Sequence, residues 1–177
     1  MEIGDVLLDA YGRIREAVHR VCAGLSPEDL AARPAPHVNS IGWLVWHLTR
    51  VQDDHVSEIA RRPQAWIEEG WIDRFALPFP PEDVGFGHPP EQVARVRPSS
   101  SDLLVGYHDA VHARTVTYLD GIDATELDRI IDRRWDPPVT VGVRLVSVLD
   151  DDLEHAGQAA YVRGLLHPGW DPLQTPG

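Results

Sequence analysis

The chain has 177 residues, enough to bury the core of one domain, and its 43% apolar and 25% charged residues are typical of a globular protein. A formal net charge of -12 without any basic cluster argues against a nucleic-acid partner or an anionic membrane surface. The single cysteine excludes an internal disulfide framework, and no stretch has the ~20 apolar residues of a membrane span. We therefore expect one cytoplasmic domain spanning residues 1–177.

Four long segments repeat apolar residues every three or four positions, which is the period of one helix face. They span residues 3–23, 40–62, 99–120 and 141–166. Ser40 and Thr140 are predicted to be N-caps, and Pro63 and Gly121 are typical stops. Shorter helical turns are expected near 26–31 and over 124–131. The pattern predicts an all-α four-helix bundle with a long irregular connection between its second and third helices.

The second long segment carries a histidine within its apolar stripe. His47 lies one turn from apolar residues on either side, and Trp43 and Trp46 flank it. Asp54 and His55 follow about two turns later, so at least one of them should also face inward. A histidine in such a stripe is more often a structural core residue than a ligand, and both readings stay open at this point.

The connection at residues 64–98 is too long for a simple turn and contains five prolines between Pro78 and Pro90. It is interpreted either as a packed connection rich in aromatic anchors or as a cover over a pocket, with His88 near its tip. In the third helix, His108 and His112 are four residues apart, which is also metal-ligand spacing. They border the apolar stripe, so a polar face is the preferred interpretation. Cys22 is expected to be a buried, inert thiol.

The last helix combines a carboxylate and an imidazole at positions that would complete its apolar stripe. Asp151 and His155 are four residues apart, so their side chains should be neighbours. Burying them bare is costly, so they should be paired or hold a metal. In the alternative, Asp151 belongs to an acidic surface run and His155 is a satisfied core histidine. Together with His47, the pair gives three possible ligands from two helices of a bundle, a common way to build a metal site.

The stretches WLVWHLTRVQDDH and DDLEHAGQAAYVRGLL resemble the DinB-like superfamily of metal-binding four-helix bundles. His47, Asp151 and His155 match the family's ligand positions. The residues that match the pattern trailing the last ligand are Gly157, Gln158 and Arg163. The branch with a carboxylate ligand resembles mycothiol-dependent maleylpyruvate isomerase and its actinobacterial relatives. Here aspartate stands where that isomerase has glutamate, so the metal should sit closer to the last helix or be bridged by water.

Two imidazoles and one carboxylate leave a coordination position open, as catalytic zinc sites do; nickel and iron are the alternatives to zinc. The resemblance implies a mycothiol-type thiol and a transferase or isomerase acting on a small molecule. Residues expected to contact the thiol are Trp43, Trp46, Gln158 and Arg163, and Asp54 and His55 are the candidate acid–base pair. The alternative is a non-catalytic, stress-related protein that binds a metal or small molecule. We also consider a homodimer as an oligomeric state of the protein.

Overall fold

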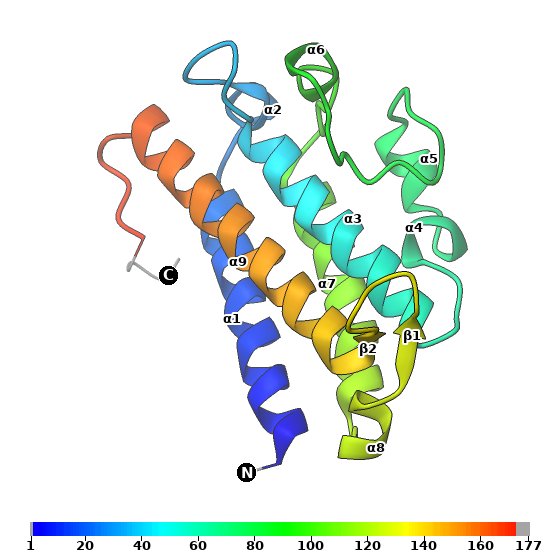
Figure 1. Cartoon of the computed structure of the whole chain (residues 1–177). Helices are drawn as coiled ribbons and strands as arrows, with labels where there is room; N and C mark the ends of the chain where they lie inside the picture. Colours follow the sequence, from blue (N-terminus) through cyan, green and yellow to red (C-terminus); the bar gives the residue numbers. More distant parts are fainter. Residues whose placement is uncertain (1, 173–177) are drawn as a thin grey trace.

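The computed structural model describes residues 2–172, and four long helices run along one another through it (Figure 1). These are α1 (Ile3–Cys22), α3 (Ile41–Ile59), α7 (Ser101–Leu119) and α9 (Val141–Leu166). Their ends lie within three residues of the predicted ones. Ser40 and Thr140 do cap α3 and α9, because their hydroxyl groups accept hydrogen bonds from the amides of Trp43 and Val143. The predicted all-α bundle is confirmed.

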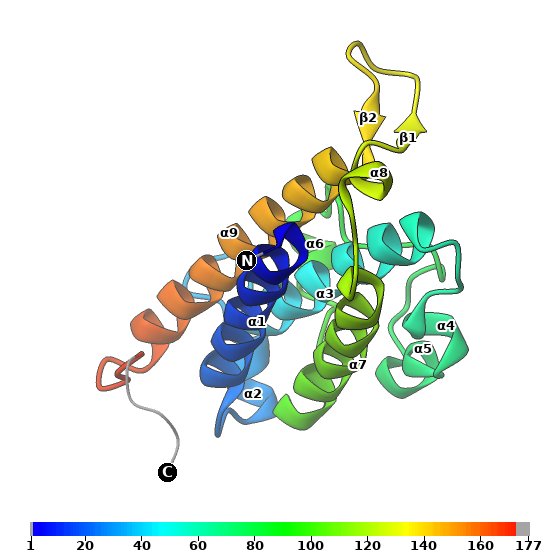
Figure 2. The ribbon, with the colours of Figure 1, turned by 90° about the horizontal axis from the view of Figure 1, so that it is seen from below.

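The four helices are not arranged around the bundle in chain order. Helix α9 packs against both α1 and α3, and α7 packs against the same two helices from the opposite side (Figures 1 and 2). The first two long helices, α1 and α3, therefore lie diagonally opposite each other. Helix α9 lies between them on one side and α7 on the other. This order makes α3 and α9 direct neighbours, so residues from the two candidate motifs can meet.

The shorter elements lie at the ends and along one side of the bundle. They are α2 (Pro27–Ala31), α4 (Ala65–Glu68), α5 (Trp71–Phe75), α6 (Pro90–Val93), α8 (Ala124–Leu127), β1 (Ile130–Asp132) and β2 (Val139–Thr140). The helix expected over 124–131 is wrong beyond Leu127, because the chain there enters strand β1, which pairs antiparallel with β2. Figure 2 shows this hairpin projecting from one end of the bundle. No helix in residues 2–172 is long and apolar enough to cross a membrane.

The connection between α3 and α7 is packed against the bundle. Trp66, Trp71 and Phe75 are buried, and their rings lie 5.3, 5.5 and 5.7 Å from the ring of Tyr107 on α7. Helices α4 and α5 contact α7 through this aromatic cluster. The remainder of the connection, up to α6, passes over α3 near His47. The long segment is therefore a packed connection with aromatic anchors, as the first interpretation of its sequence expected, and its role as a cover over a pocket stays a prediction.

The buried stripe of α9 differs from the expected one at its centre. It runs through Leu145 and Val148 to Asp152 and Ala156, and then to Ala159 and Val162. Asp151 and His155 border this stripe and are only partly buried. The one-residue difference turns their side chains by ~100° around the helix. As a result they face α3 instead of the centre of the bundle.

Candidate metal centre

Three side chains from α3 and α9 converge where the two helices pack together. One ligand atom each from His47, Asp151 and His155 lies within 4.8 Å of the others. Nε2 of His155 is 3.7 Å from Oδ1 of Asp151, and the rings of His47 and His155 are 4.8 Å apart, edge to face. The predicted trio is therefore brought together. Within residues 2–172 no other such group of three was found among His, Cys, Asp and Glu side chains.

His47 is fixed in one orientation from two sides. Its Nδ1 donates a hydrogen bond to the backbone carbonyl of Val84 in the connection, and the ring of Trp43 stacks on it at 4.6 Å. With the proton on Nδ1, the lone pair of Nε2 is free for a ligand. Burial lowers the pKa of His47; the Val84 carbonyl and Asp151 raise it, and His155 lowers it. The net effect favours the neutral, metal-binding form.

His155 is oriented in the same way by its own helix. Its Nδ1 lies 2.9 Å from Oε1 of Gln158, which can only accept, so Nε2 of His155 also carries the free lone pair. Oδ2 of Asp151 is buried and finds no hydrogen-bond partner within residues 2–172. Two free imidazole nitrogens and an unpartnered carboxylate oxygen fit a divalent metal, because metal-bound histidines normally donate their second N–H to a protein acceptor.

The competing pair on α7 has a different environment. His108 is fully buried, and its Nδ1 lies 3.2 Å from the hydroxyl of Thr49. The ring of His112 is 6.5 Å from that of His108, and neither residue belongs to a group of three possible ligands in the described chain. Burial lowers the pKa of His108 to about 3, with a further contribution from His112. His108 forms part of the polar interior between α3 and α7, whereas His112 is only partly buried.

Trp43 and Trp46 lie on the side of His47 that faces the connection. Nε1 of Trp43 donates to Nδ1 of His88 at 3.2 Å, and the ring of Trp46 stacks on His88 at 6.0 Å. His88 in turn contacts the carboxylate of Asp83 at 3.0 Å. Both tryptophans are buried. In this arrangement they hold the cover over His47, and contact of either ring with a thiol stays a prediction.

Asp54 and His55 lie further along α3 and are partly exposed. Seven and eight residues of helix place them ~10–12 Å from His47 along the axis. Nε2 of Gln64 donates to Asp54 at 2.6 Å, and Nη1 of Arg144 donates to Nδ1 of His55 at 2.8 Å. Burial lowers the pKa of His55, and Arg144 lowers it further. Because Nδ1 accepts from arginine, His55 presents an N–H at Nε2 and no free lone pair.

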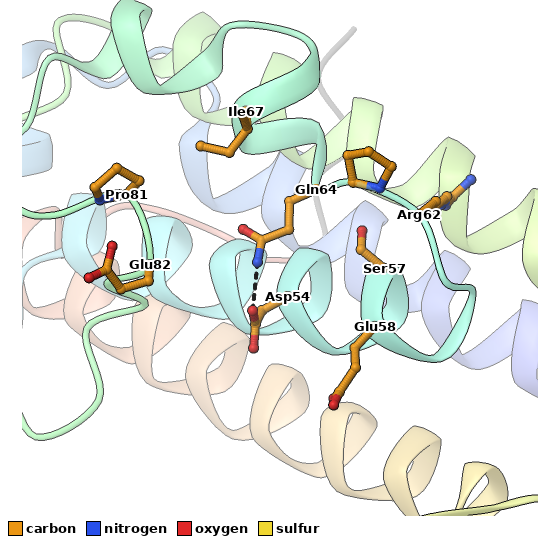
Figure 3. A pocket seen from close by; sticks show the side chains of 9 residues that line it. Asp54, Ser57, Glu58, Arg62, Gln64, Ile67, Pro81 and Glu82 are labelled. Atoms are coloured by element: carbon orange, nitrogen blue, oxygen red, sulfur yellow. Dashed lines mark hydrogen bonds between the residues drawn. The ribbon is translucent and has the colours of Figure 1, made fainter.

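A cavity of about 620 Å³ opens beside Asp54. Helix α3 contributes one wall and the connection the other (Figure 3). Its lining residues are Asp54, Ser57, Glu58, Arg62, Pro63, Gln64, Ile67, Pro81 and Glu82. Figure 3 shows the guanidinium group of Arg62 pointing away from the carboxylates of Asp54 and Glu82. Trp66, Trp71 and Phe75 of the connection are not among its lining residues, because they pack in the core.

A smaller cavity of about 160 Å³ lies between the start of α3 and the later part of α9. Its lining includes Gln158, the residue that orients His155, together with Leu44, Tyr161 and Val162. Arg163 does not line it. The guanidinium of Arg163 donates to the carbonyls of Arg20, Val21 and Ala23 at the end of α1. The contacts of Arg163 within the described chain thus join α9 to α1, and its expected role toward a thiol stays a prediction.

Sequence reasoning missed three residues that support the trio. Arg50 and Asp53 are fully buried on α3, and the carbonyl of Val84 contacts His47. The burial of Arg50 and Asp53 could have been predicted, because both lie on a helix face that also carries apolar residues. No sequence pattern marks a backbone carbonyl such as that of Val84, which is 37 residues from its partner.

Comparison with known proteins adds two findings. The model of a family described as mycothiol-S-transferase matches residues 6–168. A solved structure described as the conserved protein of locus from Enterococcus faecalis is 36% identical, with a TM-score of 0.87, covering 93% of this chain and 97% of that one. None of the curated proteins that were compared matches the chain. These findings confirm the resemblance and the helical fold predicted from the sequence.

Proposed function

The chain belongs to the mycothiol-S-transferase family, and on this premise we propose that it is a metal-dependent enzyme that uses a small thiol to modify a small molecule, by S-transfer or isomerisation. One observation carries the proposal. One possible ligand atom each of His47, Asp151 and His155 lies within 4.8 Å of the others, and no fourth such side chain joins the group within residues 2–172. A site with three protein ligands leaves a position for a thiol or water, as in catalytic zinc sites.

A divalent ion held by these residues would supply a Lewis acid that lowers the pKa of a thiol or water. The chain itself prepares the site. Val84 and Gln158 keep the proton of each imidazole on Nδ1, so both histidines offer Nε2 without a competing proton. Two nitrogens and one oxygen favour zinc, and nickel or iron would also accept this donor set.

Two cavities lie along α3, one lined by residues before His47 and one by residues after it, and no residue of the trio is among the lining residues of either. The larger cavity presents the carboxylates of Asp54 and Glu82, and Glu82 has no ion pair in the described chain. These groups would bind hydroxyl or amino groups of a sugar-like thiol or of its acceptor. The smaller cavity has room for a short apolar group.

One observation favours the alternative, a protein that binds the metal or a small molecule without catalysis. The lone pair of His55 already accepts from Arg144, and Oδ1 of Asp54 already accepts from Gln64. Both residues also lie ~10–12 Å along α3 from His47, so the expected acid–base pair is not beside the trio. A protein that only binds its ligand needs no such pair.

The experiment that separates the two functions uses purified protein loaded with zinc. Mycothiol and bacillithiol are each incubated with an electrophile such as monochlorobimane, and thiol consumption is followed over time. We expect turnover with at least one thiol that disappears in Asp151→Asn and returns to the uncatalysed rate after chelation. Binding of the thiol by calorimetry without turnover would favour the binding protein. If the protein neither binds nor consumes any thiol, the thiol-dependent function is wrong. If it also retains no zinc after gel filtration, the metal-binding alternative is wrong as well.

A further inference from the structure

Helix α3 carries a fully buried arginine one turn after His47. Arg50 has no solvent exposure, and its guanidinium points into the connection that covers the candidate metal centre. Its Nη2 donates to the carbonyl of Pro81 at 3.1 Å, and its Nε donates to the carbonyl of Asp83 at 3.3 Å. Arg50 therefore holds the backbone on both sides of Glu82.

The third nitrogen of the Arg50 guanidinium, Nη1, also has hydrogen-bond partners. Nη1 donates to Oε1 of Gln64 at 2.8 Å and to the hydroxyl of Tyr107 at 3.3 Å, and the group lies 4.8 Å above the ring of Trp66. The carboxylate of Asp53, 3.8 Å away, balances the charge. Burying an ion pair costs desolvation free energy, so such a pair is a poor source of stability by itself. This cost makes a specific positional role the better explanation for Arg50.

Asp53 fixes the other end of the same connection. Its carboxylate accepts hydrogen bonds from the amides of Ala65 and Trp66 at 2.9 and 2.8 Å, and from the hydroxyl of Tyr107 at 2.9 Å. The hydroxyl of Tyr107 gives its proton to Asp53 and accepts from Arg50, so the three groups form one network. The connection is thus attached to α3 both where it begins and where it crosses His47.

The residue that follows this attachment is the one that orients His47. Val84 comes directly after Asp83, and its carbonyl accepts from Nδ1 of His47. The turn is closed by Asp83, whose carboxylate accepts from the amide of Gly85 at 2.7 Å and contacts His88 at 3.0 Å. Gly85 has a φ of +90°, and a Cβ there would lie 2.9 Å from Trp46 and 3.0 Å from Nδ1 of His47.

We propose that Arg50 is a positioning residue for the metal centre: by holding the carbonyls of Pro81 and Asp83 it places the carbonyl of Val84 on Nδ1 of His47, and so keeps Nε2 of His47 available as a ligand. This inference rests on the proposed metal-dependent function. Arg50 itself contacts no ligand atom of the trio. Loss of such an outer hydrogen bond typically weakens metal binding by about 10- to 100-fold.

The test compares Arg50→Met with Arg129→Met. Arg129 also donates to a backbone carbonyl at α3, that of Ile59 at 2.7 Å, but at the far end of the helix. Both variants lose an arginine that contacts backbone. Zinc affinity is measured by competition with a chelator, well below each variant's unfolding temperature. We expect Arg50→Met to bind zinc about 10-fold or more weakly, with the affinity of Arg129→Met unchanged.

A second readout needs no metal. In metal-free protein, ¹⁵N NMR of the histidine side chains should show His47 as the Nδ1–H form in the wild type and in Arg129→Met. In Arg50→Met we expect a mixture of the two tautomers. Arg50→Lys keeps the charge but loses the planar fork of donors, and should give an intermediate result. An unchanged tautomer and unchanged affinity in a folded Arg50→Met protein would overturn the proposal.

If Arg50→Met does not fold, a pair of glycine variants tests the same contact from the connection. Gly85→Ala introduces a Cβ against His47, whereas Gly87→Ala has nothing within 4 Å. Both glycines have positive φ, +90° and +73°, so alanine is strained at either position. Gly85→Ala should shift the His47 tautomer and weaken zinc binding, and Gly87→Ala should do neither. Equal effects in the two variants would contradict the proposal.

The two proposals fail in distinguishable ways. If wild-type protein binds no metal, the proposed function is wrong, while the tautomer of His47 in Arg50→Met still tests the positioning role. If wild-type protein binds metal and Arg50→Met binds it equally well with the wild-type tautomer, only the positioning role is wrong.

Discussion

Nδ1 of His155 lies 2.9 Å from Oε1 of Gln158, one turn further along α9. This contact decides which nitrogen of His155 can bind a metal, and it comes from an exposed side chain on the same helix. We therefore predict that Gln158→Leu weakens zinc binding by about 10-fold, the lower end of the range for lost outer contacts, because water can partly replace the amide. Zinc affinity should stay at the wild-type value in Glu154→Gln, an exposed control on the same helix. Equal affinities in all three proteins would contradict this role of Gln158.

The second prediction concerns the three ligands. His47→Ala, His155→Ala and Asp151→Asn should each lose stoichiometric zinc, and His112→Ala should keep it. Zinc binds the native state alone, so saturating metal at 100 times its dissociation constant should stabilise the wild type by about 2.7 kcal/mol. Elemental analysis after gel filtration and thermal unfolding with and without zinc check both parts. Metal that follows His112 instead of His47 would show that the assigned site is wrong.

The sequence predicted the long helices because each buries one face, and that face leaves a period in the apolar residues. It also predicted, with the help of two motifs, that His47, Asp151 and His155 come together. It placed Asp151 and His155 in the centre of the buried stripe, where the structure has Asp152 and Ala156. A period of three to four residues defines the centre of a helix face only to within about one residue, or ~100°. The border between apolar and polar faces is where that uncertainty matters most.

The surroundings of the ligands could not be predicted in the same way. The carbonyl that orients His47 belongs to Val84, and any residue type could provide it. Its position depends on the path of the irregular connection, which Arg50 and Asp53 fix through contacts to backbone atoms. Such contacts impose no periodicity on the connection. For the same reason, the short helices α4, α5 and α6 were not foreseen within a proline-rich segment.

The third prediction concerns the pH dependence of stability. Burial lowers the pKa of His108 to about 3 from its ordinary value of 6.5. Between these values the unfolded chain binds a proton that the native chain does not, so the contribution of His108 to stability is complete above pH 6.5 and declines as the pH falls toward 3. His108→Gln should remove this proton uptake. The unfolding free energy of this variant, measured in urea on metal-free protein, should depend less steeply on pH than that of the wild type between pH 6 and pH 4. The two slopes should differ by ~1.4 kcal/mol per pH unit.

The control for this measurement is His37→Gln. The side chain of His37 is exposed in the native structure, so this variant controls for the replacement of one histidine by glutamine. A slope for His108→Gln equal to that of the wild type would mean that the native protein admits the proton, through water or an alternative conformation of α7. The comparison uses differences between variants because other carboxylates and histidines also titrate in this range.

The fourth prediction concerns Cys22, the only cysteine of the chain. Its side chain is fully buried at the end of α1, and burial raises the pKa of the thiol to about 12. A thiol reacts through its thiolate, so only ~1 in 10,000 molecules would carry a reactive sulfur at pH 8. Ellman's reagent should therefore label native protein only as fast as α1 opens, and label one thiol immediately in guanidinium. Rapid labelling of one thiol in the native protein would contradict this expectation.

The inertness of Cys22 bears on the proposed chemistry. If the protein has no reactive sulfur of its own, any sulfur that it transfers must enter as a separate thiol. Cys22→Ala should then retain zinc binding and thiol turnover, with a loss of stability of about 1 kcal/mol for the small cavity that it leaves. Loss of turnover in a folded, zinc-loaded Cys22→Ala protein would instead place the sulfur of Cys22 in the reaction. That result would require α1 to move away from Arg163, whose guanidinium now holds the carbonyls at the end of this helix.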